Sequence, residues 1–473
     1  MIFESYREEK IFFIIMIFFG AVMIFLTPPM CTPDENTHFI NAYAVGFGKV
    51  LPELCDGELG HYIPEAMSEF ISVNNQKYVG NFDIKYNFAE QYFNSWLPNN
   101  QKNPVFWNMG KLAMINPAGY LVSGLGIRIG SIFARIVGQG YDTPYNLLIF
   151  ARIFNAIFYM IVGYFAIKKA PFLKKTMLVL LLMPMSLFLG VSISYDAILI
   201  PICALFFSHI FNLILREEII KKSDIFITLM CTFFMVGIKT AYAPFLLLLL
   251  FIPRNKFGDQ ARYWKCVIAT ILVGSIVFFG YKVMLQIVLK GFQLTENSLI
   301  TEQKAYFFSH IDQIPKIAVD TLCQNIMFYM ESFYGKLGQL DTNFMLPIAV
   351  GFYILLGIIL LGEICSITDK ISWKIRIADG ILAGISFGGI FLMMYLTWTP
   401  LVLEVGGSIV SGVQGRYLIP LFLFLCVPFL NEILEKDNDW CKKIKKIGIL
   451  FSEILVIQSG ILTCLLLLIR YWI

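Results

Sequence analysis

Long apolar runs separated by short polar segments dominate the chain. A run of about 20 residues can cross a hydrocarbon core of ~30 Å as a helix. The sequence therefore predicts an all-α polytopic membrane protein with about eleven transmembrane helices. These fall near residues 11–27, 145–167, 176–192, 197–215, 225–239, 241–253, 266–288, 344–362, 377–397, 417–434 and 447–469.

Two details of these runs need interpretation. The first run lacks a small-residue cleavage site and is long enough to span a bilayer, so we read it as a retained helix rather than a removed signal peptide. The runs 225–239 and 241–253 are short for full crossings and meet at Lys239. We therefore expect this pair to be tilted, broken or re-entrant.

Lysine and arginine clusters predict the orientation of the chain. If the N-terminus is cytoplasmic, all of them fall on the cytoplasmic side, as the positive-inside rule requires. The same topology leaves 28–144 and 289–343 as long extracytoplasmic loops. The end of the first loop, 117–137, is apolar but carries Arg128 and Arg135, which predicts an interfacial helix. The clusters lie at 168–175, 221–222, 254–265, 370–376 and 442–446.

Composition supports the membrane assignment and limits the classes of partner. Hydrophobic residues make up 58% of the 473 positions and charged residues 15%, with a mean hydropathy of +0.70, far above a soluble globular protein. The net charge of +4 is modest, and basic residues lie between apolar runs, so it indicates orientation and not nucleic-acid binding. With no flexible linker, low-complexity tract or internal repeat, a single membrane domain over 1–473 is the simplest interpretation.

The 10 cysteines are scattered without CxxC pairs, and several lie within apolar runs. They indicate neither a zinc site nor a disulfide framework. Cys31 and Cys55 share the first external loop and could pair, although free thiols are the preferred interpretation.

Acidic residues follow directly on the first apolar run. In Thr32-Pro33-Asp34-Glu35, Thr32 suits an N-cap and Glu35 stands three residues later, so a capping box accounts for Glu35. The helix dipole favours a second acid by only about 0.3 to 1 kcal/mol, which makes Asp34 the stronger catalytic candidate. His38 falls on the same helical face and either orients a carboxylate, contacts substrate, or is a plain structural histidine.

Further acids are predicted on the same side of the membrane. Asp196 lies in a tight external turn, Asp341 leads into the span at 344, and Glu404 lies in a late external loop. Each is either a turn residue or part of a polar site at the membrane surface. With 4 histidines in the chain, a His-rich metal site is not expected, whereas a divalent cation held by carboxylates stays open.

Arg416 stands at the start of an apolar span on the predicted outer side, against the positive-inside trend. Such a placement requires an anionic partner, which is either a phosphate gripped bidentately or one of the external acids. Lys239, also at an outer helix end, offers a second phosphate contact. The candidate catalytic residues are thus Asp34 and Glu35, and the candidate substrate-binding residues are His38, Asp196, Lys239, Asp341, Gln414, Arg416 and Tyr417.

Short segments spread over most of the chain carry a family resemblance. They are Pro33-Asp34-Glu35 with His38-Phe39, Asn116-Pro117 with Tyr120, Ser194-Tyr195-Asp196-Ala197, Gly338-Gln339-Leu340-Asp341, and Gln414-Gly415-Arg416-Tyr417 with Pro420. In this order and spacing they resemble a bacterial family of multipass membrane proteins catalogued as a domain of unknown function and considered similar to GT-C glycosyltransferases.

The resemblance implies a GT-C-like helix bundle, with interfacial helices in its large first external loop and a polyprenyl-phosphate-linked sugar as donor. It implies that Asp34 or Glu35 acts as general base on the acceptor hydroxyl, with inversion at the anomeric carbon. Arg416 would supply the fixed cation for the leaving phosphate. Unlike better-known members, the chain has no clear soluble C-terminal domain, so acceptor recognition would fall to the external loops.

The leading hypothesis is a glycosyltransferase on the extracytoplasmic face of the bacterial cytoplasmic membrane, in contact with membrane lipids and acting on a cell-envelope glycan or lipid acceptor. The competing hypothesis is a transporter or flippase for a lipid-linked saccharide, in which the same acids and Arg416 bind cargo or couple ions. Transport predicts charged groups inside the spans. Apart from His209, the predicted spans are poor in such groups, and this favours the enzyme. A scaffold role, with the acids only capping helices, is the third interpretation.

Overall fold

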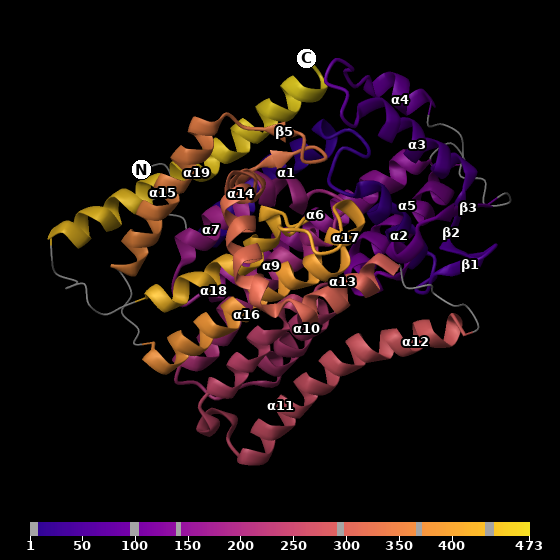
Figure 1. Cartoon of the computed structure of the whole chain (residues 1–473). Coiled ribbons are helices and arrows are strands. Elements are labelled where there is room, and N and C mark those ends of the chain that lie inside the picture. The colour runs from indigo at the N-terminus through magenta and orange to yellow at the C-terminus, as the bar shows by residue number, and fades with distance from the viewer. Residues whose placement is uncertain (1–7, 95–103, 139–142, 291–297, 366–370, 431–438) are drawn as a thin grey trace.

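The structure is a computed structural model that describes residues 8–94, 104–138, 143–290, 298–365, 371–430 and 439–473 (Figure 1). Within these ranges, 8 helices are long and apolar enough to cross a membrane. They confirm a polytopic helical membrane protein but not the predicted count of about eleven. The candidates are Glu8–Leu26, Pro117–Val137, Pro144–Lys169, Asp196–Leu215, Gln260–Val288, Leu346–Ile364, Trp373–Val402 and Asp439–Tyr471.

The other four predicted spans are shorter or broken, because proline interrupts most of them. Proline has no backbone N–H and disfavours a helical residue before it. Pro184 divides the run at 176–192, Pro244 lies within the run at 241–253, and Pro420 and Pro428 lie within the run at 417–434. The resulting elements are α7 (Lys174–Leu182) and α8 (Pro184–Gly190), α10 (Lys222–Ile238), the 3₁₀ helix η4 (Thr240–Phe251), and η8 (Gly415–Leu421), α18 (Phe422–Cys426) and η9 (Val427–Phe429).

The segment expected to be an interfacial helix forms η2 (Pro117–Tyr120) and α5 (Leu121–Val137). It is also long and apolar enough for a crossing. It packs closely on α6 (Pro144–Lys169) because Gly126 and Gly130 bring the two backbones together. A Cβ at Gly126 would lie 2.7 Å from the Phe150 carbonyl oxygen, so this small-xxx-small spacing sets the helix contact.

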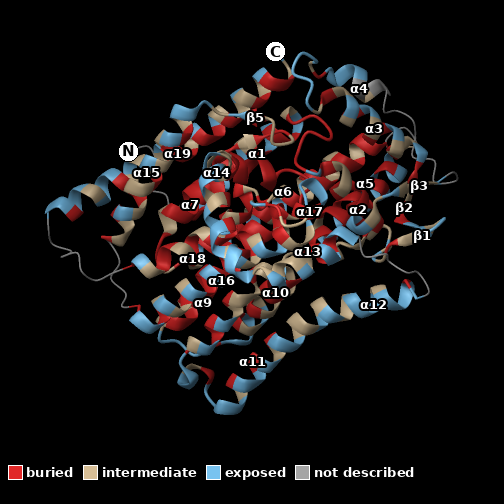
Figure 2. Ribbon diagram, in the orientation of Figure 1, coloured by how far each residue is buried: buried red, intermediate tan, exposed pale blue. Residues whose placement is uncertain are grey.

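The centre of the bundle is α9 (Asp196–Leu215), and 89% of its apolar window is buried. A helix that is hydrophobic all round belongs inside a large bundle. Figure 2 shows buried residues concentrated in α9 and its neighbours. The surrounding helices are α1 (Glu8–Leu26), α6, α7, α8 and α10, then α15 (Leu346–Ile364), α16 (Trp373–Thr397), α17 (Thr399–Val402) and α19 (Asp439–Tyr471).

One long helix stands apart from this core. It consists of α11 (Gln260–Ser275), the π-helical segment η6 (Ile276–Gly280) and α12 (Tyr281–Val288), after the short η5 (Arg254–Phe257). We call α11, η6 and α12 together the arm. Figure 1 shows the arm running along one side of the molecule, and only 17% of its apolar window is buried. Its exposed apolar side chains are those expected of a helix in contact with lipid.

The first predicted external loop folds into a small unit with its own core. Its elements are α2 (Glu35–Gly46), β1 (Glu53–Cys55), β2 (Glu58–Pro64), α3 (Glu65–Tyr78), α4 (Phe88–Asn94), β3 (Pro104–Asn108) and η1 (Gly110–Met114). The three strands form an antiparallel sheet in the order β1-β2-β3, with Leu54 opposite Leu59 and Tyr62 opposite Phe106. Cys31 is buried and not bonded to Cys55. The sequence analysis did not predict this sheet.

The second predicted external loop contains α13 (Ser298–Ser309), η7 (Ile311–Gln313), α14 (Ile314–Tyr334) and a two-stranded hairpin of β4 (Lys336–Leu337) and β5 (Thr342–Asn343). The turn of this hairpin, residues 338–341, reaches the start of α2, where the Gln339 amide donates to the Met30 carbonyl at 2.9 Å. The C-terminal end of the chain also contacts the first loop, because Tyr86 N–H donates to the Tyr471 carbonyl at 2.6 Å.

Candidate functional site

Arg416 lies at the start of η8, where the chain passes directly against α14. Gly415 makes this passage possible, since a Cβ there would lie 2.0 Å from the Tyr329 carbonyl oxygen. The Gly415 N–H donates to Ser332 Oγ at 2.8 Å, which fixes the backbone. The following side chain, Arg416, is therefore driven into the protein and is fully buried. A buried guanidinium requires anionic or hydrogen-bonding partners.

Two carboxylates from distant parts of the sequence flank this guanidinium. Arg416 Nη2 donates to Asp34 Oδ2 at 2.9 Å, and Nη1 lies 3.3 Å from Asp196 Oδ2. Arg416 Nε donates to Gln414 Oε1. The structure thus brings Asp34, Asp196, Gln414 and Arg416 together, which the sequence analysis proposed as one of two alternatives for Arg416.

Asp34 is the exposed member of this group, with 59% of its side chain accessible, whereas Arg416 beside it has none. Its backbone adopts φ 58° directly before α2 begins at Glu35. A left-handed conformation is uncommon for a residue other than glycine and is kept only where the surroundings impose it. Here Asp34 N–H donates to Gln339 Oε1 at 3.3 Å, so the 338–341 turn holds Asp34 in place.

The predicted capping box is wrong. Helix α2 begins at Glu35, Asp34 occupies the N-cap position, and no side chain caps the helix. Thr32 Oγ1 is buried and makes no hydrogen bond to any residue that the structure describes. Glu35 therefore stands in the first turn and not three residues after the cap.

Glu35 is a buried structural anchor in this structure. Arg152 of α6 donates to both of its carboxylate oxygens, Nε to Oε1 at 2.9 Å and Nη2 to Oε2 at 2.8 Å. Arg152 also donates to the carbonyls of Thr27 and Pro28, at the end of α1. A bidentate, fully buried pair of this kind ties α6 to the turn before α2. Arg152 occupies both carboxylate oxygens, so we reassign Glu35 from base to anchor.

Asp341 also lies outside the Arg416 group. Its Oδ2 is 3.6 Å from Arg470 Nη2, and its Oδ1 accepts a hydrogen bond from Thr342 Oγ1 at 2.9 Å. Arg470 in turn donates to the Tyr78 and Asn81 carbonyls of the first loop. Asp341 therefore connects the hairpin turn to the end of α19, and we reassign it from substrate binding to fold stabilisation.

His38 sits one turn into α2, between two tyrosines. Its Nδ1 lies 2.8 Å from the Tyr120 hydroxyl, and the Tyr195 ring packs edge-on at 4.9 Å between centroids. Burial lowers the pKa of His38 to about 4, with the charges of Asp34 and Arg416 acting on the ring in opposite directions. The imidazole is therefore neutral at physiological pH. Its Nε2 is buried and has no hydrogen-bond partner among the described residues.

Lys239 follows α10 and approaches the site from the other side. Its Nζ lies 3.3 Å from the centre of the Tyr417 ring, a close cation–π contact. The Tyr417 carbonyl accepts a hydrogen bond from Tyr242 Oη at 2.7 Å, which holds the ring's backbone. Lys239 Nζ is buried but makes no hydrogen bond within the described ranges.

Several buried polar atoms in this region thus lack hydrogen-bond partners in the described chain: His38 Nε2, Asp196 Oδ2, Lys239 Nζ and Arg416 Nη1. Asp196 Oδ2 and Arg416 Nη1 are paired by charge alone, at 3.3 Å. A buried polar atom without a hydrogen bond costs folding free energy, of the order of 1 to 3 kcal/mol where nothing else compensates. The concentration of such atoms in one place is the pattern expected of a site that binds a polar ligand. We call Asp34, His38, Asp196, Lys239, Gln414, Arg416 and Tyr417 the outer cluster.

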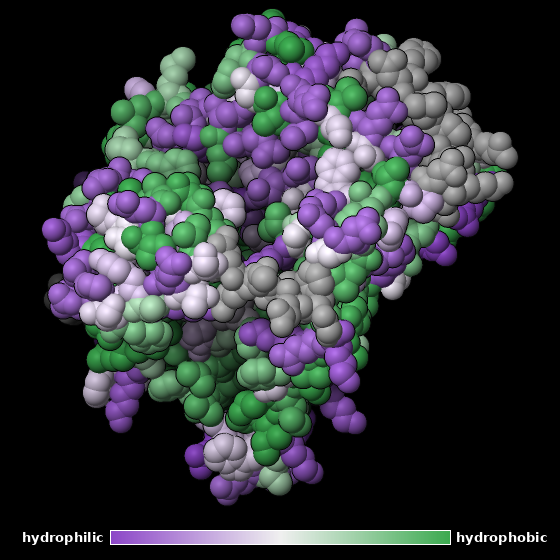
Figure 3. All heavy atoms as spheres, turned by 45° about the vertical axis from the view of Figure 1, so that its right-hand side comes forward, coloured by the Kyte–Doolittle hydropathy of each residue, from purple (hydrophilic) through white to green (hydrophobic). Residues whose placement is uncertain are grey.

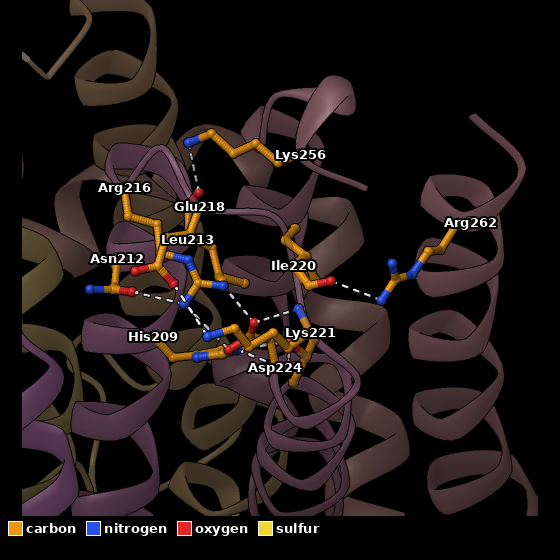
Figure 4. A network of polar contacts seen from close by, with 11 residues as sticks. His209, Asn212, Leu213, Arg216, Glu218, Ile220, Lys221, Asp224, Lys256 and Arg262 are labelled. Carbon is orange, nitrogen blue, oxygen red and sulfur yellow. Dashed lines mark hydrogen bonds and ion pairs between the residues drawn. The ribbon is translucent and has the colours of Figure 1, made fainter. Parts of the chain in front are cut away.

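A second polar cluster lies at the opposite ends of α9 and α10 (Figure 4). There the Asp224 carboxylate pairs with Arg216 and accepts the Lys221 N–H at 2.8 Å. Lys256 Nζ donates to the last carbonyls of α9, at Leu213 and Ile214. His209 Nε2 lies 3.0 Å from the Asp224 carbonyl. We call this group the Asp224 cluster, which locks the α9–α10 connection.

The described residues contain no group of three or more His, Cys, Asp or Glu side chains arranged to hold a metal ion. In the outer cluster the two carboxylates face a guanidinium rather than each other. The described residues therefore provide no ligand set for the divalent cation that the sequence left open.

The candidate spans contain more charged residues than the sequence led us to expect. Arg152 lies in α6, and Asp379 lies in α16 with both carboxylate oxygens buried and without a hydrogen-bond partner in the described structure. Both were read as parts of apolar runs. The signal that could have found them is simple, since an ionisable residue within a span marks a structural or functional site.

Hydrophilic and hydrophobic residues occupy separate parts of the molecular surface. Figure 3 shows a hollow with hydrophilic residues on its walls, above a region dominated by hydrophobic residues. A cavity of about 720 Å³ opens beside Lys239 between α10, η4, α16 and the arm. Its lining is mainly aliphatic and aromatic.

Fold and surface together define a polytopic α-helical membrane protein with a polar cluster at one end of its central helix. A family model described as "Predicted membrane protein (DUF2142)" matches residues 17–425. The chain belongs to this family. No curated protein and no solved structure matches it.

Proposed function

We propose that the protein is a GT-C-like membrane glycosyltransferase that moves a sugar from a polyprenyl-phosphate-linked donor to a cell-envelope glycan or lipid acceptor. The observation that carries the proposal is the outer cluster itself. An exposed carboxylate, Asp34, stands directly against a buried guanidinium, and a second buried cation, Lys239, lies close by without a hydrogen-bond partner in the described structure. A base and an anion-binding group side by side suit transfer from a phosphate leaving group.

In the proposed reaction, Asp34 takes the proton from an acceptor hydroxyl. The acceptor oxygen then forms a bond to the anomeric carbon, while the bond from that carbon to the phosphate oxygen breaks. The electron pair leaves with the polyprenyl phosphate. Because one displacement occurs at the carbon, the configuration inverts. The accessibility of Asp34 supports its role, since an acceptor hydroxyl must reach the base within hydrogen-bond distance.

Charge balance supports the pairing of these residues. The outer cluster holds two acids, Asp34 and Asp196, and two cations, Lys239 and Arg416. As the phosphate gains one negative charge on leaving, Asp34 loses one by accepting the proton, so the total is unchanged. Protonation also releases Arg416 Nη2 from Asp34 and leaves it free to bind the phosphate. Arg416 would thus connect the base to the leaving group.

The proposal places the outer cluster on the extracytoplasmic face of a bacterial cytoplasmic membrane, with the N-terminus in the cytoplasm. The basic residues of the Asp224 cluster, at the other ends of α9 and α10, support this orientation through the positive-inside rule.

The test is a transfer assay on purified protein in lipid nanodiscs, with a panel of polyprenyl-phosphate sugars and an envelope acceptor. We expect Asp34→Asn and Arg416→Lys each to reduce transfer by about 10² to 10³-fold, because one loses the base and the other the bidentate contact. Asp83→Asn, an exposed acid of the same loop, is the matched control and should transfer normally. Full transfer by Asp34→Asn would refute the assignment of the base.

One observation favours the alternative, a transporter or flippase for a lipid-linked saccharide. Asp379 is buried in a candidate span with both oxygens unpaired within the described ranges, as an ion-coupling residue would be. With Arg152 and Asp379 inside candidate spans, the charge content of the spans does not argue against transport. Flux of a fluorescent lipid-linked saccharide in proteoliposomes that is lost in Asp379→Asn, without any transfer by the wild type, would establish this alternative.

A further inference from the structure

The cavity beside Lys239 is a groove between the arm and the body of the bundle. Its volume is about 720 Å³, within the range of ligand sites. On the body side it is bounded by η4 and by one face of α16, including Ile385, Gly389 and Met393. On the arm side it is bounded by Phe278, Tyr281 and Leu285. Figure 1 shows the arm running beside the body of the bundle.

The outer surface of the arm is apolar and exposed, including Ile276, Phe279, Val283 and Ile287. In a membrane protein, such a surface contacts lipid. A groove between a lipid-facing helix and the bundle therefore offers a membrane lipid a lateral path into the protein. The groove lining is also apolar, so its occupant is hydrocarbon over most of its length.

The groove is charged at one end only. Lys239 lines it there, and its buried Nζ contacts the Tyr417 ring, the neighbour of Arg416. Lys282 of α12 lines it too, with Nζ 4.0 Å from the centre of the Phe278 ring. Two cations at one end of an apolar groove complement an amphiphile with one anionic head.

The arm is fastened to the body at this charged end by two hydrogen bonds. Asn116 Nδ2 donates to the Val277 carbonyl at 3.2 Å, and Tyr281 Oη donates to the Ile115 carbonyl at 3.2 Å. Val277 lies in the π-helical segment, where the i→i−4 ladder is interrupted and carbonyls accept from elsewhere. Asn116 Oδ1 also accepts the Ala118 N–H, at the start of η2, which carries Tyr120.

We propose that this groove binds the hydrocarbon chain of the polyprenyl-phosphate donor, entering from the bilayer between the arm and α16, with its phosphate at Lys239. The inference rests on the proposed function for the identity of the lipid. Charge at one end and continuity with the outer cluster through Tyr417 argue for a lipid phosphate over a neutral lipid. The hydrogen bonds of Asn116 and Tyr281 hold the arm against the body at the charged end of the groove.

Glycines on α16 provide a matched pair of test variants. Gly389 lines the groove, and a Cβ there would meet no atom within 4 Å, so a large side chain enters the groove without straining the helix. Gly388, its neighbour, also has open space around it, but it is exposed and does not line the groove. Gly389→Phe therefore obstructs the proposed chain site, whereas Gly388→Phe adds the same bulk elsewhere.

The experiment uses the full-length protein in nanodiscs and a polyprenyl phosphate that carries a photoactivatable diazirine within its chain. We expect crosslinks in η4, η6, α12 and α16, which line the groove, reduced about tenfold or more in Gly389→Phe and unchanged in Gly388→Phe. A polyprenol with the same diazirine but no phosphate should crosslink weakly, and excess phosphatidylglycerol should not compete. Competition by phosphatidylglycerol would overturn the donor as occupant in favour of a bulk lipid.

The outcomes separate the groove from the proposed function. Equal labelling of both glycine variants, labelling outside these helices, or normal transfer by Gly389→Phe would overturn the groove and leave the enzyme standing. Groove labelling that Gly389→Phe removes, in a protein that transfers no sugar, would keep the groove and refute the transferase.

Discussion

The two ends of α9 and α10 carry polar clusters that differ in how fully their members are paired. In the Asp224 cluster, the carboxylate accepts from a guanidinium and a backbone N–H, and only Arg216 Nε lacks a partner among the described residues. In the outer cluster, Lys239 Nζ makes no hydrogen bond to the described chain, and Asp196 Oδ2 and Arg416 Nη1 form an ion pair at 3.3 Å but no hydrogen bond. A satisfied network fixes a structure, whereas an unsatisfied one is ready to bind a ligand.

The backbones of the two clusters also differ: that of the Asp224 cluster is regular, and that of the outer cluster is strained. Asp224 lies in the first turn of a regular helix, and its side chain accepts the backbone N–H of the N-cap residue, Lys221, at 2.8 Å. Asp34 occupies a left-handed position before a helix that no side chain caps. Strain of this kind persists only where other contacts impose it, and here Gln339 imposes it from a turn about 300 residues away. Local sequence thus builds the Asp224 cluster, and tertiary contacts build the outer cluster.

The largest effect expected from this contrast is on stability at the Asp224 cluster. Asp224→Asn removes the charge that pairs with Arg216, and we expect the free energy of unfolding to fall by about 3 kcal/mol. Transfer per folded molecule should not change, because this cluster is about one helix length from Asp34. Thermal unfolding in detergent and transfer normalised to folded protein measure the two effects.

The same substitution at the other end, Asp196→Asn, is the counterpart. It should impair transfer more than stability, because Asp196 Oδ2 meets Arg416 Nη1 at 3.3 Å without a hydrogen bond, a weaker pairing than that of Asp224 with Arg216. If Asp224→Asn instead abolished transfer without lowering the unfolding temperature, the two clusters would not differ in the way proposed.

The second prediction concerns pH. The folded pKa of His38 is about 4, and an unperturbed histidine has a pKa near 6.5. Between these values the unfolded chain binds more protons, so stability rises with pH and is lost as the pH falls from 6.5 to 4. The full effect is at most about 3 kcal/mol for one histidine. His38→Gln should flatten this part of the stability curve, as measured by denaturant unfolding across the range.

His61 is the matched control, because burial also lowers its pKa to about 4 while it lies in β2, away from Arg416. His61→Gln should flatten the curve as well but leave transfer unchanged, whereas His38→Gln should affect both. An undiminished pH slope in His38→Gln would show that His38 is not held neutral in the outer cluster.

Sequence patterns predicted the outer cluster better than the fold around it. The predicted topology alone placed Asp34 and Arg416 on the same face of the membrane, although 382 positions separate them. Each basic cluster fixes the orientation of the spans on either side of it, so the clusters together constrain every span. Glu35 stayed a second catalytic candidate behind Asp34, since its partner Arg152 was hidden within an apolar run. The count of about eleven spans was not confirmed, because proline breaks such as Pro184 divide runs that hydropathy alone treats as continuous. The β1–β2 hairpin had an available signal, the Asp56-Gly57 turn, where both residues have positive φ.

The smallest predicted effect provides the sharpest contrast between the clusters. Lys239 holds a buried ammonium without a hydrogen bond to the described chain, and such a group destabilises the fold unless a ligand pairs with it. Lys239→Met keeps the length and removes the charge, so we expect the protein to become more stable by about 1 kcal/mol. Binding of polyprenyl phosphate should weaken by about tenfold. Thermal unfolding and lipid titration in nanodiscs measure the two changes.

Lys256→Met in the Asp224 cluster is the control with the opposite sign. Its ammonium donates to two α9 carbonyls, so its removal leaves those acceptors unpaired and should destabilise the protein without affecting lipid binding. If Lys239→Met stabilises the protein and Lys256→Met destabilises it, the Lys239 charge is kept for binding at the expense of stability. A loss of stability in Lys239→Met, with lipid binding intact, would instead make Lys239 a structural residue whose cation–π contact with Tyr417 holds η8 in place.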